Sequence, residues 1–580
     1  MSLPEIGVKF SDLSLSLELT EDQVNRGMST VPQVLMNGVT APFKKLALSL
    51  SQSAPAKPKG QTISILDSSS GYISPGRMTL LLGHPGSGKS TLLKALTGRL
   101  SDKSKLSGSV SYSGLNEAEV AGAGMHLGNL VQYVSQLDEH FPFLTVRETL
   151  MFCCEASLAT REEAVARVDE VAKQLHLTGC LDTMIGNDIQ RGVSGGEKKR
   201  VTVGEGLCTN ARFLALDEIS TGLDSAITYS IVQSLRERAL NEKMGVLIAL
   251  LQPTPEVVAL FDDIILQREG SILYSGPVNG VAPYLKTLGF SPPSNIRGEG
   301  RDEDLADYLA EFLAFPVARL SKDLKKSSSN LEPLTTTGTS SQPTTTAALA
   351  GAWKNSAVYK ESLGPLVPPS PPTLSSPLAV QLYGRRYQHS SLFYASLLCK
   401  RQLLLMGRNK LFIGFRVFSA FFMSIVFGGL YYQGDIYDGL NKYGLFLNVC
   451  MHLCFANISE MSGAVDSKYI GYRHVANNLH PSWAFVLAPF LGHIPLAIAE
   501  SLTFGVIAYF MAGMTFEVGR FFIFFLLILL CDIFAATLFR CFAFSAPSLV
   551  SAQAGYVKLL CVCVCVCVCV GFFAFLSSHS

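Results

Sequence analysis

A glycine-rich segment has the composition of a phosphate-binding loop. Residues 83–90 read GHPGSGKS, with the apolar run MTLLL before them and the amphipathic run TLLKALTG after them. In the pattern GxxxxGK[ST], glycines let backbone N–H groups point at phosphates, the lysine reaches the β- and γ-phosphates, and the hydroxyl binds Mg²⁺. The flanking strand and helix patterns disfavour a chance glycine-rich turn. The predicted nucleotide-binding residues here are Gly83, His84, Pro85, Gly86, Ser87, Gly88, Lys89, Ser90 and Thr91.

An apolar run that ends in two carboxylates follows downstream. Residues 213–220 read FLALDEIS. Asp217 is expected to hold the Mg²⁺ shell through water, and Glu218 to polarise an attacking water molecule. Acidic strand ends are common, so the evidence is the order of the segments: phosphate loop, this strand, then TGLDS at residues 221–225. Together with Lys89, Glu218 is predicted to be catalytic in the hydrolysis of a nucleoside triphosphate.

A third segment, RGVSGGEKKR at residues 191–200, predicts a helix that begins after a Ser-Gly-Gly sequence. Ser194, Gly195 and Gly196 would place a hydroxyl and free backbone N–H groups at a positive helix end, which favours an anion. The chain already has one phosphate loop. A second anion-binding helix start makes sense when it covers a nucleotide that another subunit holds. As a bare capping motif, the sequence would mean little.

Three regions follow from the changes in composition along the chain. Residues 1–320 alternate strand and helix patterns, which favours a layered α/β domain. Residues 321–384 are rich in proline, serine and threonine and are predicted to be a flexible linker. Residues 385–575 contain apolar runs of about 20 residues each, the length that crosses a bilayer.

The apolar region predicts a multi-pass, all-α membrane domain. Pro489 and Pro495 lie in the third run, which could be kinked or broken there. Basic residues recur on alternate sides of the runs, and residues 1–19 show no basic-then-apolar signal pattern, so residues 1–320 are expected in the cytosol. The five predicted spans are residues 411–432, 443–461, 483–513, 521–544 and 549–575.

Polar side chains interrupt the predicted spans at three positions. Arg416, Glu500 and Asp532 lie at apparent membrane depth. Such residues are often functional, because a charge in lipid is costly. Packing against neighbouring helices is an equally open interpretation.

Charge and cysteine content exclude other classes of protein. The net charge is +1 with 16% charged residues, so no nucleic-acid partner is expected. Five of the 14 cysteines lie in CVCVCVCVCV at residues 561–570, a pattern that a TG dinucleotide repeat in DNA would encode. The other nine lack CxxC spacing, so neither a disulfide framework nor a zinc site is indicated.

In this order and company the motifs resemble the ATP-binding cassette of an ABC transporter. The order of the domains, with the cassette before the membrane domain, resembles that of the G subfamily. The sequences of the motifs are similar to those of its pleiotropic drug resistance branch. The fold that the resemblance implies is an α/β P-loop NTPase followed by an all-α polytopic membrane domain, with ATP and Mg²⁺ as cofactors. It also implies that Gln136, in VSQLDEH, is a catalytic residue and touches the metal alongside Ser90 and Asp217. Ser194, Gly195 and Gly196 would contact the γ-phosphate across a dimer, and Asp224 would communicate between the two sites.

The sequence departs from the family pattern in three ways. Leu251, in ALLQP, occupies the position of a histidine that contacts the γ-phosphate, so this site is expected to hydrolyse slowly. Five spans are found where six are usual. One cassette–membrane half is present where full-length members carry two.

The resemblance implies ATP-driven export of hydrophobic small molecules or lipids. The expected partners are a second half-transporter, identical or different, or a missing second half, together with membrane lipid. The plasma membrane is favoured over an internal membrane. The alternative is an ATP-binding but hydrolysis-poor regulatory half, or a non-functional truncated product, which Leu251 and the Cys-Val segment favour.

Overall fold

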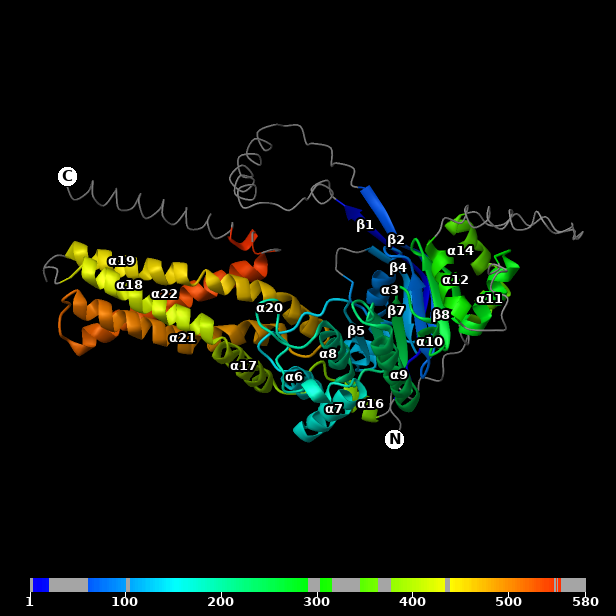
Figure 1. The fold of residues 1–580 in the computed structure, drawn as a ribbon, viewed down its shortest axis with the longest axis horizontal. Helices are drawn as coiled ribbons and strands as arrows, with labels where there is room; N and C mark the ends of the chain where they lie inside the picture. The colour runs from blue at the N-terminus through cyan, green and yellow to red at the C-terminus, as the bar shows by residue number, and fades with distance from the viewer. Residues whose placement is uncertain are drawn as a thin grey trace, which may run out of the picture. The chain divides into compact units, whose positions relative to one another are not determined.

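The chain folds into two compact units (Figure 1). Residues 1–19, 60–390 and 474–479 form one that we call the cassette unit. The other unit, which we call the membrane unit, contains residues 391–473 and those from 480 onward. The computed structural model describes residues 4–19, 61–100, 105–290, 303–314, 345–362, 377–432, 439–546, 549 and 551–553.

A six-stranded sheet in the order β5-β6-β7-β3-β8-β9 forms the core of the cassette unit. All neighbouring pairs are parallel except β8 and β9. β3, β5, β6 and β7 are buried along their whole length, as expected of parallel strands with both faces covered. Parallel strands end at a common edge, where α/β folds bind ligands. The strands are β3 (Met78–Gly83), β5 (Val131–Val134), β6 (Phe213–Asp217), β7 (Gly245–Leu250), β8 (Asp263–Arg268) and β9 (Ser271–Pro277).

An antiparallel sheet in the order β2-β1-β4 completes the strands of this unit. Its strands are β1 (Val8–Leu19), β2 (Gln61–Ile73) and β4 (Lys105–Tyr112). Val8, Phe10, Leu13 and Leu15 are buried, so β1 gives its apolar side chains to the core.

Helices cover the main sheet, and several begin at capping boxes. At Thr145, Thr160 and Ser194 the side chain accepts from a backbone N–H three residues on, and the glutamate there accepts from the cap's own N–H. These reciprocal bonds fix where each helix begins. The helices are α3 (Lys89–Leu96), α4 (Glu117–Gly122), α5 (Leu127–Leu130), α6 (Val146–Ser157), α7 (Arg161–Gln174), α8 (Gly195–Leu207), α9 (Ser225–Glu242), α10 (Pro255–Val258), α11 (Val278–Thr287) and α12 (Glu303–Ala314), with a 3₁₀ turn at Thr178–Cys180.

Part of the predicted linker is helical. It contains α14 (Thr346–Lys354), α15 (Ala357–Ser362) and α16 (Pro377–Tyr383). Trp353 of α14 is buried, with its ring centroid 5.1 Å from that of Tyr274 and 5.2 Å from that of Tyr284. The short apolar run AALAGAW thus packs in the fold, although the proline-, serine- and threonine-rich sequence around it predicted a linker. The boundaries 1–320, 321–384 and 385–575 remain predictions.

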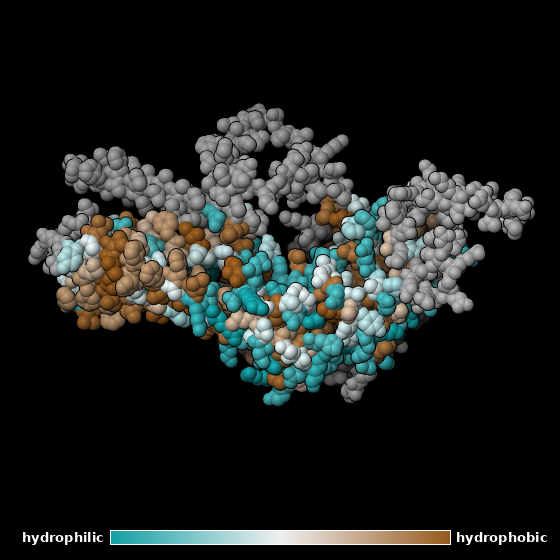
Figure 2. Space-filling view, in the orientation of Figure 1, coloured by the Kyte–Doolittle hydropathy of each residue, from teal (hydrophilic) through white to brown (hydrophobic). Residues whose placement is uncertain are grey.

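The membrane unit is helical, and Figure 2 shows apolar side chains gathered over its surface. Among the described residues, three of its helices are long and apolar enough to cross a membrane: α18, α21 and α22. The predicted fold class, an α/β P-loop domain followed by a helical membrane domain, is confirmed. The helices are α17 (Ser391–Arg408), α18 (Lys410–Leu430), α19 (Gly439–Ala456), α20 (Ser459–Ala476), α21 (Ser482–Met511) and α22 (Val518–Ser545).

The five predicted spans require correction. The run at residues 443–461 is not one helix, because α19 ends at Ala456 and α20 begins at Ser459. With its polar residues, α19 is not among the candidate spans of the described residues. The third run is unbroken: α21 continues through Pro489 and Pro495. The fifth run lies mostly outside the described residues.

Polar and small side chains at every fourth position form the buried face of α18. Arg416, Ala420, Ser424 and Gly428 are buried there, whereas Phe415, Phe418 and Phe422 are exposed. Small residues let transmembrane helices approach closely. A Cβ added at Gly428 would lie 2.9 Å from Cβ of Met511 on α21.

Candidate functional site

The glycine-rich loop connects β3 to α3 at the carboxyl edge of the main sheet. Gly86 and Gly88 have φ values of 82° and 96°, in the left-handed region that only glycine adopts at little cost. At Gly83 a Cβ would lie 2.6 Å from the backbone oxygen of Gln267, so close approach excludes any side chain. The backbone path therefore explains the three glycines of the motif.

Lys89 folds back over this loop. Its Nζ donates to the backbone oxygens of Gly83 at 2.9 Å and His84 at 3.3 Å, and lies 3.6 Å from Oε1 of Glu218. The side chain is almost fully buried. Burial lowers the pKa of Lys89 from its ordinary value, while the Glu218 carboxylate opposes that shift. The loop thus holds the Lys89 ammonium at a place where phosphate oxygens could accept the hydrogen bonds that the carbonyl oxygens of Gly83 and His84 now accept.

Glu218 follows the last residue of β6, two strands away from β3. Its Oε2 accepts a hydrogen bond of 2.6 Å from Nε2 of Gln136. Glu218 has a φ of 47°, which costs a side-chain-bearing residue free energy and often marks a functional site. Its backbone N–H donates to the oxygen of Ala249 on β7 at 3.0 Å, which holds this conformation. The structure therefore brings together Lys89, Gln136 and Glu218, which lie far apart in the sequence.

Asp217 lies beside them with one oxygen engaged. Oδ2 accepts a hydrogen bond of 2.8 Å from the hydroxyl of Tyr133 on β5. Burial, together with this carboxylate, raises the pKa of Tyr133, so the hydroxyl stays a donor. Within the described residues, the buried Oδ1 has no hydrogen-bond partner. A buried unpartnered carboxylate oxygen next to a phosphate loop suits the water shell of Mg²⁺.

The predicted Ser-Gly-Gly site opens α8 as expected. Oγ of Ser194 accepts from the N–H of Glu197, whose carboxylate accepts from the backbone N–H of Ser194 at 2.8 Å. The hydrogen bond from this backbone N–H is the main reason why the pKa of Glu197 is lowered. A Cβ at Gly195 would meet no atom within 4 Å. Within the described residues, Ser194 and the two glycines make no hydrogen bond to the phosphate loop.

Asp224 caps the next helix. Its Oδ1 accepts a hydrogen bond of 2.7 Å from the N–H of Ile227 at the start of α9. A Cβ at Gly196 would lie 3.2 Å from Leu223, so the starts of α8 and α9 are in close contact. The segment TGLDS and the Ser-Gly-Gly segment therefore share one surface.

Two residues of this region were missed from the sequence, Tyr133 and Lys199. Nζ of Lys199 donates to the backbone oxygen of Gln136 at 2.6 Å and lies 3.0 Å from Oδ2 of Asp138. This buried lysine links α8 to the Gln136 segment. The run EKKR after Ser-Gly-Gly was the available signal, but a charge run usually indicates a solvated helix face.

Leu251 follows β7 and lines a cavity of about 300 Å³ beside the phosphate loop. His84, Pro85 and Gln252 border the same cavity, together with Leu313 of α12. The position expected to carry a γ-phosphate contact thus lies at the loop but has no hydrogen-bonding group.

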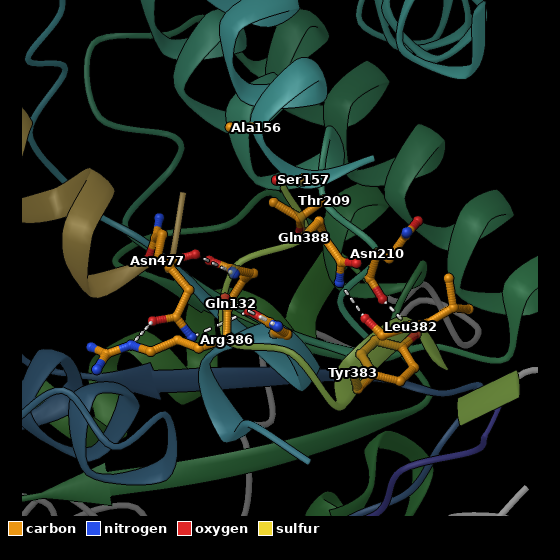
Figure 3. Close-up of a pocket in the computed structure, with 12 residues that line it drawn as sticks. Gln132, Ala156, Ser157, Thr209, Asn210, Leu382, Tyr383, Arg386, Gln388 and Asn477 are labelled. Carbon is orange, nitrogen blue, oxygen red and sulfur yellow. Dashed lines mark hydrogen bonds between the residues drawn. The ribbon is translucent and has the colours of Figure 1, made fainter. Parts of the chain in front are cut away.

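Within the cassette unit, residues 474–479 are held to the rest of the unit through amide side chains (Figure 3). Nε2 of Gln132 donates to the backbone oxygen of Asn477 at 3.3 Å, and Nδ2 of Asn478 donates to Oδ1 of Asn129 at 3.2 Å. Nε of Arg386 donates to Oδ1 of Asn478 at 3.3 Å. The residues that make these hydrogen bonds line a small pocket, and the bonds hold residues 474–479 in place.

In the membrane unit the polar residues predicted at membrane depth form one network. Arg416 makes two hydrogen bonds of 2.6 Å to the carboxylate of Glu500. The guanidinium also donates to Oδ1 of Asn457 at 3.1 Å, and Asn457 donates to Asp532. All four residues are buried. The three charged residues thus face neighbouring helices, one of the two interpretations that the sequence left open.

The fold and the site define a P-loop nucleotide-binding domain that precedes a helical membrane domain. Two family models match the corresponding segments. Residues 66–221 match the family described as ABC transporter, and residues 395–578 match that described as ABC-2 type transporter. The chain therefore combines a segment similar to the ABC transporter family with one similar to the ABC-2 type transporter family, and the resemblance that its motifs carry is confirmed.

Plant relatives of the G family match most of the chain. The ABC transporter G family member 31 of Arabidopsis thaliana is 32% identical, covering 95% of this chain and 39% of its own length. The ABC transporter G family member 51 of Oryza sativa is 32% identical, covering 93% and 38%. The Pleiotropic drug resistance protein 1 of Nicotiana tabacum is also 32% identical, with the same coverages. The chain spans less than two fifths of the length of these relatives.

Proposed function

We propose that the chain is one half of a transporter that hydrolyses ATP to export hydrophobic small molecules or lipids. The single observation that supports this most is the grouping of Lys89, Gln136 and Glu218 just after the ends of β3, β5 and β6. The Glu218 carboxylate, which would act on water, lies 3.6 Å from the Lys89 ammonium, which would bind phosphate. The same carboxylate accepts a hydrogen bond of 2.6 Å from the Gln136 amide, which orients it.

Each of these side chains has a proposed role in hydrolysis. Lys89 binds the β- and γ-phosphate oxygens, and the backbone N–H groups of the loop bind the remainder. Glu218 orients the attacking water and accepts its proton. Gln136 holds the Glu218 carboxylate toward the loop. When phosphate takes Lys89, the contact between Lys89 and Glu218 is relieved, which frees the carboxylate for water.

Mg²⁺ fits the oxygen ligands at this edge of the sheet. Ser90, Gln136 and, through water, Asp217 are the residues that would hold it, and the unpartnered Oδ1 of Asp217 supports this. The ion would neutralise negative charge on the phosphates. Tyr133 and Lys199 keep Asp217 and the Gln136 segment in position.

The Ser-Gly-Gly surface indicates a partner cassette. Ser194, Gly195 and Gly196 start a helix whose free backbone N–H groups would suit an anion, and in the part of the chain that the structure describes they make no hydrogen bond to the chain's own phosphate loop. A second copy, or a different half, would place this helix end over the nucleotide. Asp224 lies on the same surface and would be at the boundary of the two cassettes. The length of the relatives is consistent with two such halves per transporter.

Location follows from the same proposal. The cassette unit is assigned to the cytosol, and the membrane unit to the plasma membrane in preference to an internal membrane. Exposed apolar side chains of α18 and α22, such as Phe415 and Phe534, suit contact with lipid or with apolar substrates.

A second candidate function rests on Leu251. An apolar side chain at the loop offers no hydrogen bond to the γ-phosphate, which favours a half that binds ATP but hydrolyses it slowly. Such a half would regulate a more active partner.

Nucleotide binding and transport by Lys89→Met test the proposal. The purified chain in lipid vesicles is expected to bind ATP and to accumulate lipophilic probes when ATP is added. Lys89→Met removes the loop cation and should lose both activities, whereas Lys173→Met, an exposed lysine of α7, should keep both. Full ATP-dependent accumulation by Lys89→Met would contradict the proposal. ATP binding without accumulation in the wild type would favour the regulatory half.

A further inference from the structure

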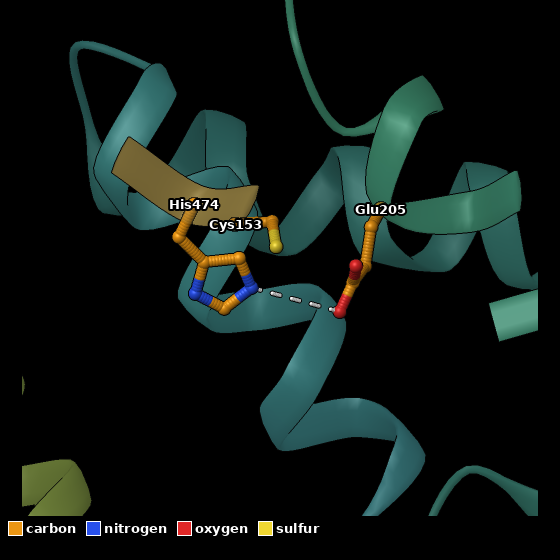
Figure 4. Close-up of side chains that lie close together, drawn as sticks. All are labelled: Cys153, Glu205 and His474. Carbon is orange, nitrogen blue, oxygen red and sulfur yellow. Dashed lines mark ion pairs between the residues drawn. The ribbon is translucent and has the colours of Figure 1, made fainter. Parts of the chain in front are cut away.

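Three side chains of metal-ligand type meet outside the nucleotide site (Figure 4). They are Cys153 of α6, Glu205 of α8 and His474 in the last turn of α20. Their ligand atoms all lie within 4.8 Å of one another, and all three residues are buried. Residues 474–479 belong to the cassette unit, so the group lies within one compact unit.

The surrounding contacts hold these side chains in place. Nε2 of His474 lies 4.0 Å from Oε1 of Glu205. The ring of Phe152 lies 5.4 Å from the His474 ring, centroid to centroid, and limits its position. On the other side, Nδ1 of His140 lies at a hydrogen-bond distance of 3.2 Å from the same oxygen of Glu205. His140 is in turn bonded through Nε2 to the hydroxyl of Thr202 at 2.8 Å.

The ligand set selects a class of ion. A thiolate, an imidazole and a carboxylate together suit a borderline transition metal such as Zn²⁺, whereas Mg²⁺ and Ca²⁺ prefer oxygen alone. Tetrahedral Zn²⁺ with bonds of 2.0–2.3 Å spaces its ligand atoms about 3.3–3.8 Å apart. The observed separations therefore need only small side-chain rotations.

Charge also favours a divalent cation. Metal binding deprotonates the Cys153 thiol, so the occupied site would carry two negative charges, one on the thiolate and one on the Glu205 carboxylate. Zn²⁺ with a neutral imidazole cancels that charge. Ligating carboxylates are usually hydrogen-bonded in turn, and His140 is placed to supply that bond to Glu205.

We propose that Cys153, Glu205 and His474 form a binding site for Zn²⁺ or a similar divalent transition metal, with water in the fourth position. The ion joins α6, the helix α8 that begins after Ser194, and residues 474–479. Asn477 and Asn478 already hydrogen-bond to Gln132 and Asn129, so the ion adds a second attachment for this segment. A ligand that binds the folded state alone stabilises it, and the site should therefore raise thermal stability.

Cobalt titration of the full chain in detergent, stripped of metal and free of nucleotide, tests the site. Co²⁺ should bind with a thiolate charge-transfer absorption that Zn²⁺ removes. Cys153→Ser should abolish this component and His474→Ala should weaken its binding at least tenfold. Cys180→Ser, a buried cysteine elsewhere in the cassette unit, is the matched control and should retain it.

Other cysteines of the chain, including five in residues 561–570, can also bind cobalt. The diagnostic signal is therefore the difference between wild type and Cys153→Ser. An identical titration of both proteins would overturn the proposal, as would a titration of His474→Ala equal to that of Cys180→Ser. Melting temperature is the second readout: Zn²⁺ should raise it for wild type and Cys180→Ser, and a rise of the same size in both ligand variants would also overturn the site.

Discussion

Leu251 shows how a single side chain at the phosphate loop could set the rate of hydrolysis. It borders the cavity that His84 and Pro85 also line, and its position follows the buried strand β7. An isobutyl group offers no hydrogen bond to a γ-phosphate. A side chain at position 251 that donates a hydrogen bond would stabilise the negative charge of the γ-phosphate at the loop.

Leu251→His is expected to raise the ATPase rate of the purified chain. One restored hydrogen bond to a charged group is worth about 1–3 kcal/mol, roughly five- to a hundredfold in rate. Leu251→Met, which keeps the volume but adds no donor, is the control and should leave the rate unchanged. A fall in rate with histidine, or an equal rise with methionine, would show that the leucine is not a missing contact.

Residues whose roles depend on local pattern were predictable from the sequence, and the structure brings Lys89, Gln136 and Glu218 together as the motifs implied. Tyr133 and Lys199 were not found, because their importance comes from single hydrogen bonds to Asp217 and to the Gln136 backbone. No spacing rule connects residues that meet only in the fold.

At the scale of helices, α18 is held to its neighbours by small side chains and by one buried ion pair. Breaking such a pair leaves an uncompensated charge, whereas replacing both members by apolar residues is often tolerated. Arg416 and Glu500 allow this distinction to be measured.

Arg416→Met alone should destabilise the membrane unit by about 3–5 kcal/mol, because Glu500 is left buried without its cation. The double variant Arg416→Met/Glu500→Met should recover much of that loss. Thermal unfolding in detergent, followed for the wild type, Arg416→Met, Glu500→Met and the double variant, measures both effects. If the double variant lost as much stability as the two single variants together, the role of these residues would not be confined to charge pairing.

Gly428 and its neighbour Gly429 give a matched pair on the same helix. An added Cβ lies 2.9 Å from Cβ of Met511 at Gly428 and meets nothing within 4 Å at Gly429. Gly428→Ala is therefore expected to destabilise the protein by about 1–3 kcal/mol through overpacking. Gly429→Ala should be neutral or stabilising by up to about 1 kcal/mol, because alanine favours the helix. Equal melting temperatures for the two variants would contradict close packing of α18 on α21.

Helix and strand type could be predicted from periodicity, but two features of the elements could not. The break between α19 and α20 at Asn457 and Ile458 lies inside residues 443–461, which were predicted from the sequence to be one span. Conversely, Pro489 and Pro495 are accommodated in α21, although proline removes a helical hydrogen bond. Tertiary contacts, such as the hydrogen bonds of Asn457, decide where these helices end.

At the scale of the whole molecule, the proposal requires two cassettes to complete each nucleotide site. Each site would take Lys89 from one chain and Ser194 from the other. In a dimer of two Lys89 variant chains, or of two Ser194 variant chains, both nucleotide sites therefore carry a substitution.

Mixing Lys89→Met with Ser194→Arg chains should restore ATPase activity. A mixed pair places both substitutions at one site and leaves the other site intact. With random pairing, half of the dimers are mixed, so the rate should reach about a quarter of that of the wild type. Activity no higher than that of either variant alone would contradict pairing between two copies and would point to a different half as the partner.

The most direct measurement compares ATP turnover and ATP retention of wild type and Glu218→Gln in lipid. The amide keeps the shape of the side chain but cannot accept the proton of water, so Glu218→Gln should still bind ATP, hydrolyse it at least about a hundredfold more slowly, and retain it in a closed pair of cassettes. Glu237→Gln, an exposed glutamate of α9, should behave like the wild type. Turnover by Glu218→Gln at the wild-type rate would contradict hydrolysis at this site.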